Sequence, residues 1–506
     1  MSSKIYTAAI LGLNAELVEV EADTGGGDFG MVAIVGLPDA AVSESKERIR
    51  SAIKNSGFQF PRVKTTVNLA PADIKKQGPG YDLPIAISVL MAVGRVKQSE
   101  YLENSLFVGE LALSGEVRPV NGVLSIAILA REKGYKNIFI PSKNKKEATL
   151  ISGINIYPVN NLLEIVDHLN NKQTIKNEVA EKIVFKKQDL EYDMSHVKGQ
   201  AFAKRALEIA AAGAHNMLMS GPPGSGKTLL ARTMPSILPN MTESEAMEVT
   251  KIYSVSGKLN DKNNLMLNRP FRAPHHTSSG VSLVGGGVWP KPGEISLAHR
   301  GVLFLDEFGE FSRSVLENLR QPLEDGMVNV SRASGNVSFP SKFILIAATN
   351  PCPCGYSGDP EKECICSSSQ VINYNKKVSG PILDRVDLHV EVPRISYEKL
   401  ASERKEESSE EIQKRVQAAR NIQIRRFAKS KYVSNSEMNS KAVENFCVLN
   451  NESKKLLKKA SESLHFSARS YFRIIKIART IADLEASVNI SLEHLSEALQ
   501  YRAKSV

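Results

Sequence analysis

The sequence predicts an α/β protein: a parallel-sheet core, an all-helical C-terminal part, and an α+β region before the core. Three observations favour this fold class. Short apolar runs typical of buried strands alternate with helical patterns over residues 191–395. Residues 396–506 show helical periodicity almost throughout, and residues 1–170 mix strand-like runs with amphipathic helices. A chain of 506 residues is long enough for about three structural units.

The region 1–170 contains four strand-like runs, namely MVAIVG, TTVNLA, LFVGELAL and NIFIPS. The segment DAAVSESKERIRSAIKNSG has apolar residues at helical spacing, and Gly57 supplies a stop. The run from Leu83 to Val93 predicts a core helix, because it contains a proline and is shorter than the ~20 residues of a membrane span. Residues 171–190 are polar and highly charged, so they predict an exposed linker, with a short helix as the alternative.

Composition sets broad limits. An apolar content of 42% and a charged content of 24% are ordinary for a globular protein. The formal charge of +10 is compatible with a polyanionic partner such as nucleic acid but does not demonstrate one. The N-terminus shows no signal peptide and no run predicts a transmembrane helix, so we expect a cytoplasmic, reducing location and no membrane partner.

The strongest motif is GPPGSGKT, which matches G-x-x-x-x-G-K-[ST] in full. It follows the apolar run NMLM and precedes a helical pattern, as a phosphate-binding loop requires. The candidate nucleotide-binding residues are Gly221, Pro222, Pro223, Gly224, Ser225, Gly226, Lys227 and Thr228. In this interpretation Lys227 reaches the β- and γ-phosphates of ATP and Thr228 ligates Mg²⁺.

A second element complements this loop. The run GVLFLDEF predicts a buried strand that delivers Asp306 and Glu307 at its C-terminal end, where α/β sheets place ligands. Asp306 would complete the Mg²⁺ shell, and Glu307 would polarise the attacking water. An ordinary acidic pair at a strand end is the alternative, which the preceding phosphate loop disfavours.

Three further residues are candidates for the same chemistry. Asn350 ends the strand run FILIAATN and could orient water, or simply cap a loop. Arg385 could neutralise charge on the phosphoryl group in a neighbouring subunit, or form a surface ion pair. Arg469 opens a long amphipathic helix and could contact phosphate, or be a solvated charge.

These motifs together resemble the AAA+ ATPases, specifically the magnesium-chelatase-like group and within it the ComM/YifB family. The segments that carry the resemblance extend over most of residues 193–490, and include GPPGSGKT, RPFRAPHHTSS, KPGEISLAHRGVLFLDEF, QPLEDGMVNVSRASG, AATNPCPCGYSGDP and SARSYFRIIKIARTIADLE. The resemblance implies an AAA+ core over 191–395 and a helical lid over 396–506. It also implies the family roles of single residues: Walker A for Lys227 and Thr228, Walker B for Asp306 and Glu307, sensor 1 for Asn350, arginine finger for Arg385 and sensor 2 for Arg469.

The same resemblance implies further features. Val197 and Gln200 would lie near the adenine. A β-hairpin before sensor 1 would be GMVNVSRASGNVSFP, with its turn near residues 333–335, and a second insert would fall within residues 260–290. In related ring helicases both inserts touch DNA, which makes Arg332 a candidate DNA contact. His275 and His276 are adjacent and make a poor metal pair, so we interpret them as structural.

The N-terminal region resembles the proteolytic domain of Lon protease, a ribosomal-protein-S5-like fold that RadA-type recombination proteins share. KKQGPGYDLPIAI and LFVGELALSGEVRPVNGVLSIAILAREKGYKNIFIPSKN carry this resemblance. Lon-type proteolysis needs a nucleophilic serine and an activating lysine. The aligned positions here are Gly80 and Ile126, so we expect a proteolytically inactive domain that serves as a scaffold or polymer-binding platform.

Four of the five cysteines lie within NPCPCGYSGDPEKECIC, as two C-x-C pairs. Cys352, Cys354, Cys364 and Cys366 could close a tetrahedral structural Zn²⁺ site, remain free thiols or form redox disulfides. The intervening turn formers let the two pairs face each other, which favours zinc. Cys447 lies alone in the helical part and is most simply a small core residue.

We therefore predict a ring-forming, hexameric ATPase that uses ATP and Mg²⁺ while moving on branched or single-stranded DNA. The family resemblance implies branch migration during recombination and natural transformation. A chelatase-type subunit that remodels a protein or metal-insertion complex is the alternative; the chain lacks an integrin-like metal-binding domain. An ATP-dependent protease conflicts with Gly80 and Ile126.

Overall fold

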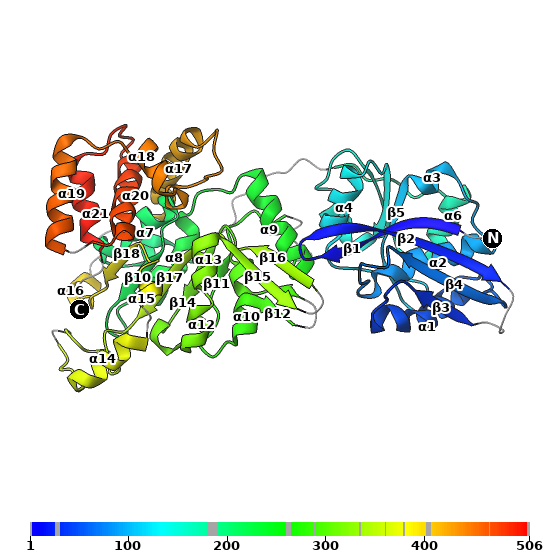
Figure 1. The fold of residues 1–506 in the computed structure, drawn as a ribbon, viewed down its shortest axis with the longest axis horizontal. Helices are drawn as coiled ribbons and strands as arrows, with labels where there is room; N and C mark the ends of the chain where they lie inside the picture. The colour runs from blue at the N-terminus through cyan, green and yellow to red at the C-terminus, as the bar shows by residue number, and fades with distance from the viewer. Residues whose placement is uncertain are drawn as a thin grey trace.

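The computed structural model shows an elongated molecule: the N-terminal region lies at one end, a parallel sheet in the middle and the C-terminal helices at the other end (Figure 1). The described residues are 3–25, 31–180, 191–259, 265–287, 290–332, 335–359, 361–377, 380–400, 406–464 and 466–502. Within these ranges no helix combines the length and apolarity that crossing a membrane requires.

The N-terminal region is built on a seven-stranded mixed sheet of order β3-β4-β2-β1-β5-β8-β9. Its β1–β2 and β2–β4 pairs are antiparallel, and the other neighbours are parallel. The strands are β1 Ser3–Leu11, β2 Asn14–Gly25, β3 Val32–Val35, β4 Lys64–Ala70, β5 Ser105–Phe107, β8 Asn137–Pro141 and β9 Asn155–Val159, beside a small pair β6 Glu110–Leu111 and β7 Val117–Arg118.

Helices cover both faces of this sheet. The helices α1, α2 and α6 share one apolar cluster with strand residues such as Val18, Val20 and Leu69, whereas α4 belongs to the cluster on the other face. The predicted helix at Leu83–Val93 is confirmed as the buried α2. The helices are α1 Ala40–Asn55, α2 Asp82–Ala92, α3 Glu100–Glu103, α4 Val123–Glu132, α5 Lys145–Ala148 and α6 Leu162–Leu169.

The middle of the chain forms a five-stranded sheet of order β11-β14-β17-β10-β18, in which every pair is parallel. This confirms the parallel sheet that the apolar runs predict. The strands are β10 Met217–Ser220, β11 Phe271–Arg272, β14 Val302–Leu305, β17 Ile344–Thr349 and β18 Leu388–Glu391. Its helices are α7 Ala201–Gly213, α8 Lys227–Ile237, α9 Glu243–Ser256, α10 Gly280–Val284, α11 Glu294–Leu297, α12 Arg313–Glu317, α13 Arg320–Asp325, α14 Ser368–Lys377, α15 Gly380–Leu383 and α16 Tyr397–Leu400.

Two short antiparallel hairpins project from this core. The predicted hairpin before Asn350 is present as β15 Met327–Arg332 paired with β16 Gly335–Pro340. Its predicted turn lies outside the described residues, except for Gly335. The second hairpin pairs β12 Gly285–Gly286 with β13 Lys291–Pro292 and falls partly in the predicted insert.

The C-terminal part is helical, as predicted. Ser408 caps α17, and its side chain and Glu411 form a reciprocal capping box that fixes the start of this helix. One continuous apolar cluster joins these helices to α7 and the parallel sheet. The helices are α17 Ser409–Arg426, α18 Ser440–Phe446, α19 Asn451–Leu464, α20 Ala468–Leu484 and α21 Leu492–Gln500.

The N-terminal region docks on α9 and on the β15–β16 hairpin, beside which β1 lies in Figure 1. In the β1–β2 turn, a Cβ on Gly12 would lie 2.4 Å from the Val337 side chain of the hairpin. The Ser254 hydroxyl at the end of α9 donates to the buried Glu147 carboxylate. Of the predicted exposed linker, residues 171–180 are described, and most of them are exposed. Ile175 is buried and the Glu178 N–H donates to the Ile156 carbonyl, so the stretch is attached to the N-terminal region at these two residues.

Candidate nucleotide site

The loop after β10 forms an open cradle. Gly221 approaches the end of β18 so closely that a Cβ there would lie 2.1 Å from the Val392 carbonyl oxygen. Gly224 and Gly226 have φ angles of 77° and 91°, which favour glycine, and a Cβ on either would meet nothing within 4 Å. The Ser225 hydroxyl is buried without a hydrogen-bond partner among the described residues. The loop thus offers open space and an unpaired hydroxyl directly before the N-terminus of α8, which fits a phosphate.

Lys227, the first residue of α8, turns its ammonium group back over this cradle. Its Nζ lies 2.6 Å from the Gly221 carbonyl oxygen, 2.9 Å from that of Pro222 and 3.3 Å from Asn350 Oδ1. Burial lowers the pKa of Lys227, and Asp306 opposes this shift. A partly desolvated cation at this position would gain strongly from a phosphate group.

Two carboxylates follow the buried strand β14, as predicted. The Thr228 hydroxyl donates to Asp306 Oδ2 over 2.7 Å, and the Glu307 N–H donates to Asp306 Oδ1 over 3.0 Å. A hydroxyl and a carboxylate are hard oxygen ligands of the kind Mg²⁺ takes, so Thr228 and Asp306 could hold the ion beside the cradle. Glu307 has a φ of 51°, and its side chain remains more than half exposed, which leaves the carboxylate accessible to water.

His276 is a neighbour of this site that the sequence reasoning missed. Its Nδ1 lies 3.2 Å from a carboxylate oxygen of Glu307, whereas His275 Nδ1 pairs with the Thr277 hydroxyl over 2.9 Å. A signal for this contact existed in the sequence. His276 follows β11, and β11 lies beside β14, so the residues after both strands meet at the same edge of a parallel sheet.

The two predicted adenine-side residues differ in their placement. Val197 is buried in the apolar core. Gln200 precedes α7 with a φ of 55°, and its side-chain amide donates to the Pro393 carbonyl over 2.6 Å and to the Ser225 carbonyl over 3.4 Å. Gln200 therefore joins the phosphate cradle to the chain that leaves β18.

Arg385 and Arg469 lie at the opposite edge of the parallel sheet from Lys227. The Arg385 carbonyl accepts from Asn216, which precedes β10, whereas the cradle follows β10. Four strand residues at about 3.3 Å each separate the two ends by about 13 Å. Glu324 in α13 binds both arginines: it pairs with Arg385 and, over 2.9 Å, with Arg469.

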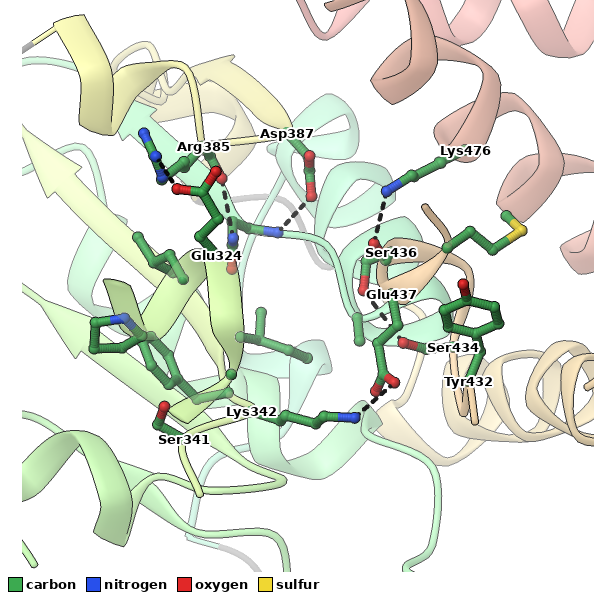
Figure 2. Close-up of a pocket in the computed structure, with 18 of the residues that line it drawn as sticks. Glu324, Ser341, Lys342, Arg385, Asp387, Tyr432, Ser434, Ser436, Glu437 and Lys476 are labelled. Carbon is green, nitrogen blue, oxygen red and sulfur yellow. Dashed lines mark hydrogen bonds and ion pairs between the residues drawn. The ribbon is translucent and has the colours of Figure 1, made fainter. Parts of the chain in front are cut away.

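These arginines border a pocket of about 810 Å³ between the sheet edge and the C-terminal helices. Figure 2 shows Glu324 and Arg385 on one side of it and the Lys342–Glu437 pair on another. Lys476 of α20 donates to the Ser436 carbonyl over 2.9 Å, and burial lowers its pKa. The pocket is lined by charged side chains of both signs, many of them paired across it.

The four clustered cysteines converge. Their sulfur atoms all lie within 4.8 Å of one another, and three of the distances are 3.3 Å, 3.6 Å and 3.7 Å. A tetrahedral site with Zn–S bonds near 2.3 Å has sulfurs about 3.8 Å apart, whereas a disulfide needs about 2.05 Å. A hydrogen bond from the backbone of Tyr356 is the main cause that lowers the pKa of Cys354 to about 6. The cluster can therefore hold a metal ion; Cys447 is separate and buried, as expected of a core residue.

The two positions of the N-terminal region that align with the serine and lysine of Lon protease have apolar surroundings. A Cβ on Gly80 would meet Val108 and Val120 side chains, and Ile126 is buried within α4. Neither residue carries a nucleophile or a base.

The candidate DNA residue, Arg332, ends β15 opposite Gly335.

Comparison with known proteins then identifies the family. The family described as magnesium chelatase, subunit ChlI, matches residues 193–400, its C-terminal part matches residues 406–502, and a further ChlI family matches residues 18–144. Competence protein ComM of Haemophilus influenzae is 44% identical over 508 residues, which cover 99% of this chain and 97% of that protein. The chain belongs to the ComM/YifB family of magnesium-chelatase-like proteins.

Two further relatives are informative. The uncharacterized protein YifB of Salmonella typhimurium is 41% identical over 501 residues, covering 99% of this chain and 96% of that protein. Lon protease 2 of Bacillus subtilis is 28% identical over 178 residues, or 32% of each chain. The predicted family is confirmed, and membership of this AAA+ group supports ATP and Mg²⁺ as ligands of this chain.

Proposed function

We propose that this chain is a ring-forming AAA+ ATPase, hexameric in its active state, that couples ATP hydrolysis to movement on DNA. One observation carries the proposal: Lys227, Thr228, Asp306, Glu307 and Asn350 meet at one edge of the sheet, while Arg385 and Arg469 gather at the other. The first group can bind and hydrolyse a nucleotide. The second can reach a nucleotide only on another copy of the chain.

Within one subunit the roles follow from position. Lys227 would bind the β- and γ-phosphates, and Thr228 and Asp306 would hold Mg²⁺, which neutralises charge on the phosphates. Glu307 would accept a proton from the attacking water, and Asn350 would orient that water. Positioning and electrostatic stabilisation supply most of the catalysis in phosphoryl transfer.

The second half of each site would come from the neighbouring subunit. Arg385 and Arg469 would neutralise charge that develops on the transferred phosphoryl group. Glu324 holds the two arginines near each other, although they are far apart in sequence. A closed ring presents each such edge to the next subunit's cradle, which supports a cyclic homo-oligomer.

DNA as the substrate has separate support. The chain has a net charge of +10, and the β15–β16 hairpin with Arg332 lies on the same core as the nucleotide site. A relative that matches this chain over nearly its full length is a competence protein. We therefore assign branch migration of recombination intermediates, in the cytoplasm, as the activity of this chain.

A second candidate is a chelatase-type ATPase subunit that remodels a protein or metal-insertion complex. The family descriptions that name magnesium chelatase favour it. The N-terminal region, which we assign to the S5-like fold of the Lon proteolytic domain, would serve as an inactive scaffold in either case, because Gly80 and Ile126 replace the reactive pair.

The four cysteines would hold a structural Zn²⁺ ion. Four thiolates complete its coordination and leave no open position for catalysis. The sulfur separations support this assignment over disulfides.

Steady-state ATP hydrolysis tests the proposal. It is measured at two salt concentrations, without DNA and with single-stranded, duplex and four-way-junction DNA, and Glu307→Gln is the control that cannot hydrolyse. We expect DNA to stimulate hydrolysis, and the stimulation to weaken with salt because counterions compete for the phosphates. ATP hydrolysis that no DNA stimulates, with no DNA binding, would exclude the DNA motor and favour a protein substrate.

A further inference from the structure

The cysteine knuckle, defined as residues 352–359 and 361–366, lies against the phosphate cradle of the same chain. Gly355 has a φ of 87°, and a Cβ there would lie 2.6 Å from Pro223 Cδ and 3.9 Å from the Asn350 side-chain carbon. At Gly355 the backbone of the knuckle thus lies against the cradle residue Pro223 and near the side chain of the predicted sensor, Asn350. Both contacts use residues that the nucleotide site needs.

The other side of the knuckle is attached to the same site through Arg394. Arg394 lies 3.0 Å from the Asp359 carboxylate, and its guanidinium lies 5.5 Å from the centre of the Tyr356 ring. Arg394 follows Pro393, whose carbonyl accepts the 2.6 Å hydrogen bond from Gln200. The knuckle therefore connects the chain after β17 with the chain after β18, across the opening of the cradle.

The described part of the knuckle has little apolar packing of its own. Cys352 is its one buried hydrophobic residue, and Ile365 is 87% exposed. The Ser357 and Cys354 N–H groups donate to the Cys352 and Cys366 sulfurs, a pattern that stabilises thiolates around a metal. In a loop of this kind, the free energy of metal binding is what fixes the fold.

We propose that the cysteine knuckle braces the phosphate cradle, so that metal loading of the four thiols sets the affinity for nucleotide. The metal would hold Gly355 against Pro223 and thereby hold the cradle in its phosphate-binding shape. Loss of the metal by chelation would release the cradle and weaken nucleotide binding. This inference rests on the nucleotide site proposed above and adds a metal-dependent control to it.

The test measures the zinc content and the dissociation constant for a fluorescent ATP analogue with Mg²⁺. The full chain is used as purified, and again after treatment with a zinc-selective chelator and desalting. Cys364→Ser removes one direct ligand; mutating even an outer-shell partner typically weakens metal binding about 10–100-fold, so we expect at least as large a loss here. We expect about one zinc per chain as purified, and about tenfold weaker nucleotide binding when zinc is removed by either route.

Two glycine variants separate bracing from general loop damage. Gly355→Ala forces a side chain against Pro223, whereas Gly358→Ala places the same strain, at a φ of 79°, where a Cβ meets nothing within 4 Å. We expect Gly355→Ala to keep its zinc and bind nucleotide about tenfold more weakly, while Gly358→Ala keeps both properties.

Failure of this inference and failure of the proposed function give different results in these measurements. Nucleotide binding that is unchanged after chelation overturns the inference, even if Cys364→Ser fails to fold. Equal nucleotide affinity of the two glycine variants overturns it as well. A wild-type chain that holds zinc but binds no nucleotide contradicts the proposed function instead.

Discussion

The imidazole Nδ1 of His276 lies 3.2 Å from a carboxylate oxygen of Glu307. Glu307 is the residue that would activate water, and its side chain is more than half exposed. His276 belongs to the segment that leads from β11 into α10 and the β12–β13 hairpin. The contact therefore couples the position of the segment between β11 and the β12–β13 hairpin to the carboxylate of Glu307.

This contact predicts that His276→Ala lowers kcat for ATP about three- to tenfold and leaves KM almost unchanged, because Glu307 loses its positioning partner but phosphate binding is intact. His276→Asn, which can still donate a hydrogen bond, should restore part of the rate. His275→Ala is the matched control, since His275 pairs with Thr277 and not with Glu307. A loss of kcat in the His275 variant as large as that in the His276 variant would contradict a specific role for His276.

A second prediction concerns shared sites. Lys227→Ala and Arg385→Ala should each be inactive alone, yet a mixture of the two should regain part of the ATPase activity. In a mixed ring, some interfaces combine an intact Lys227 from one subunit with an intact Arg385 from the next. We expect roughly a quarter of the wild-type rate at equal mixing, if a lost arginine finger costs its usual 10³-fold or more.

The control for this experiment is a mixture of Lys227→Ala with Glu307→Gln. Both changes lie on the cradle side of the sheet, so each site in the mixed ring stays defective. Activity in this control mixture, or none in the first mixture, would show that the sites are not shared as proposed.

Much of this arrangement was predictable because the signal is local. The strands β10, β14 and β17 are continuous apolar runs, and each ends directly in the residues that meet at the cradle. The ends of neighbouring parallel strands must lie together, so the sequence predicts the meeting of Lys227, Asp306 and Asn350. Helix α17 also begins at a local signal, because Ser408 caps its first turn.

Contacts that lie away from the ends of the parallel strands were not predictable. Glu324 joins Arg385 to Arg469, and Gly355 meets Pro223, only because tertiary packing places their elements together. Hydrophobic periodicity carries no information about such pairs. The sequence analysis also assigned no strands to β1 and β2, where alanine and glutamate, which are poor strand formers, are frequent.

A third prediction follows from Asp82, a buried carboxyl group in the N-terminal region. Burial raises its pKa from 3.8 to about 6, although Arg48 at 2.9 Å opposes the shift. A raised pKa means that the folded state binds the proton more tightly, so the stabilisation is complete below pH 3.8 and is lost as the pH rises through 6. Two pKa units correspond to about 3 kcal/mol.

Urea unfolding of the wild type and of Asp82→Asn at pH 4 and pH 7 measures this effect. The stability of the wild type relative to the variant should fall by about 2 kcal/mol over that interval, since asparagine does not titrate and the unfolded carboxyl group is already more than half ionised at pH 4. A stability difference that stays constant with pH would show that Asp82 has the same pKa in both states.

The last prediction concerns DNA. Arg332 ends β15, next to the turn of a hairpin whose Val328, Val330 and Phe339 pack in the core and whose Val337 lies against the β1–β2 turn. If Arg332 contacts a DNA phosphate, Arg332→Ala should weaken binding to all DNA sequences alike. It should also reduce the slope of log K against log salt concentration by about one. Arg425→Ala, which removes an exposed charge from α17, is the control of equal net charge. If this slope is unchanged for the Arg332 variant, or is reduced equally for both variants, Arg332 makes no specific contact with a DNA phosphate. The hairpin would then not be a DNA-binding element.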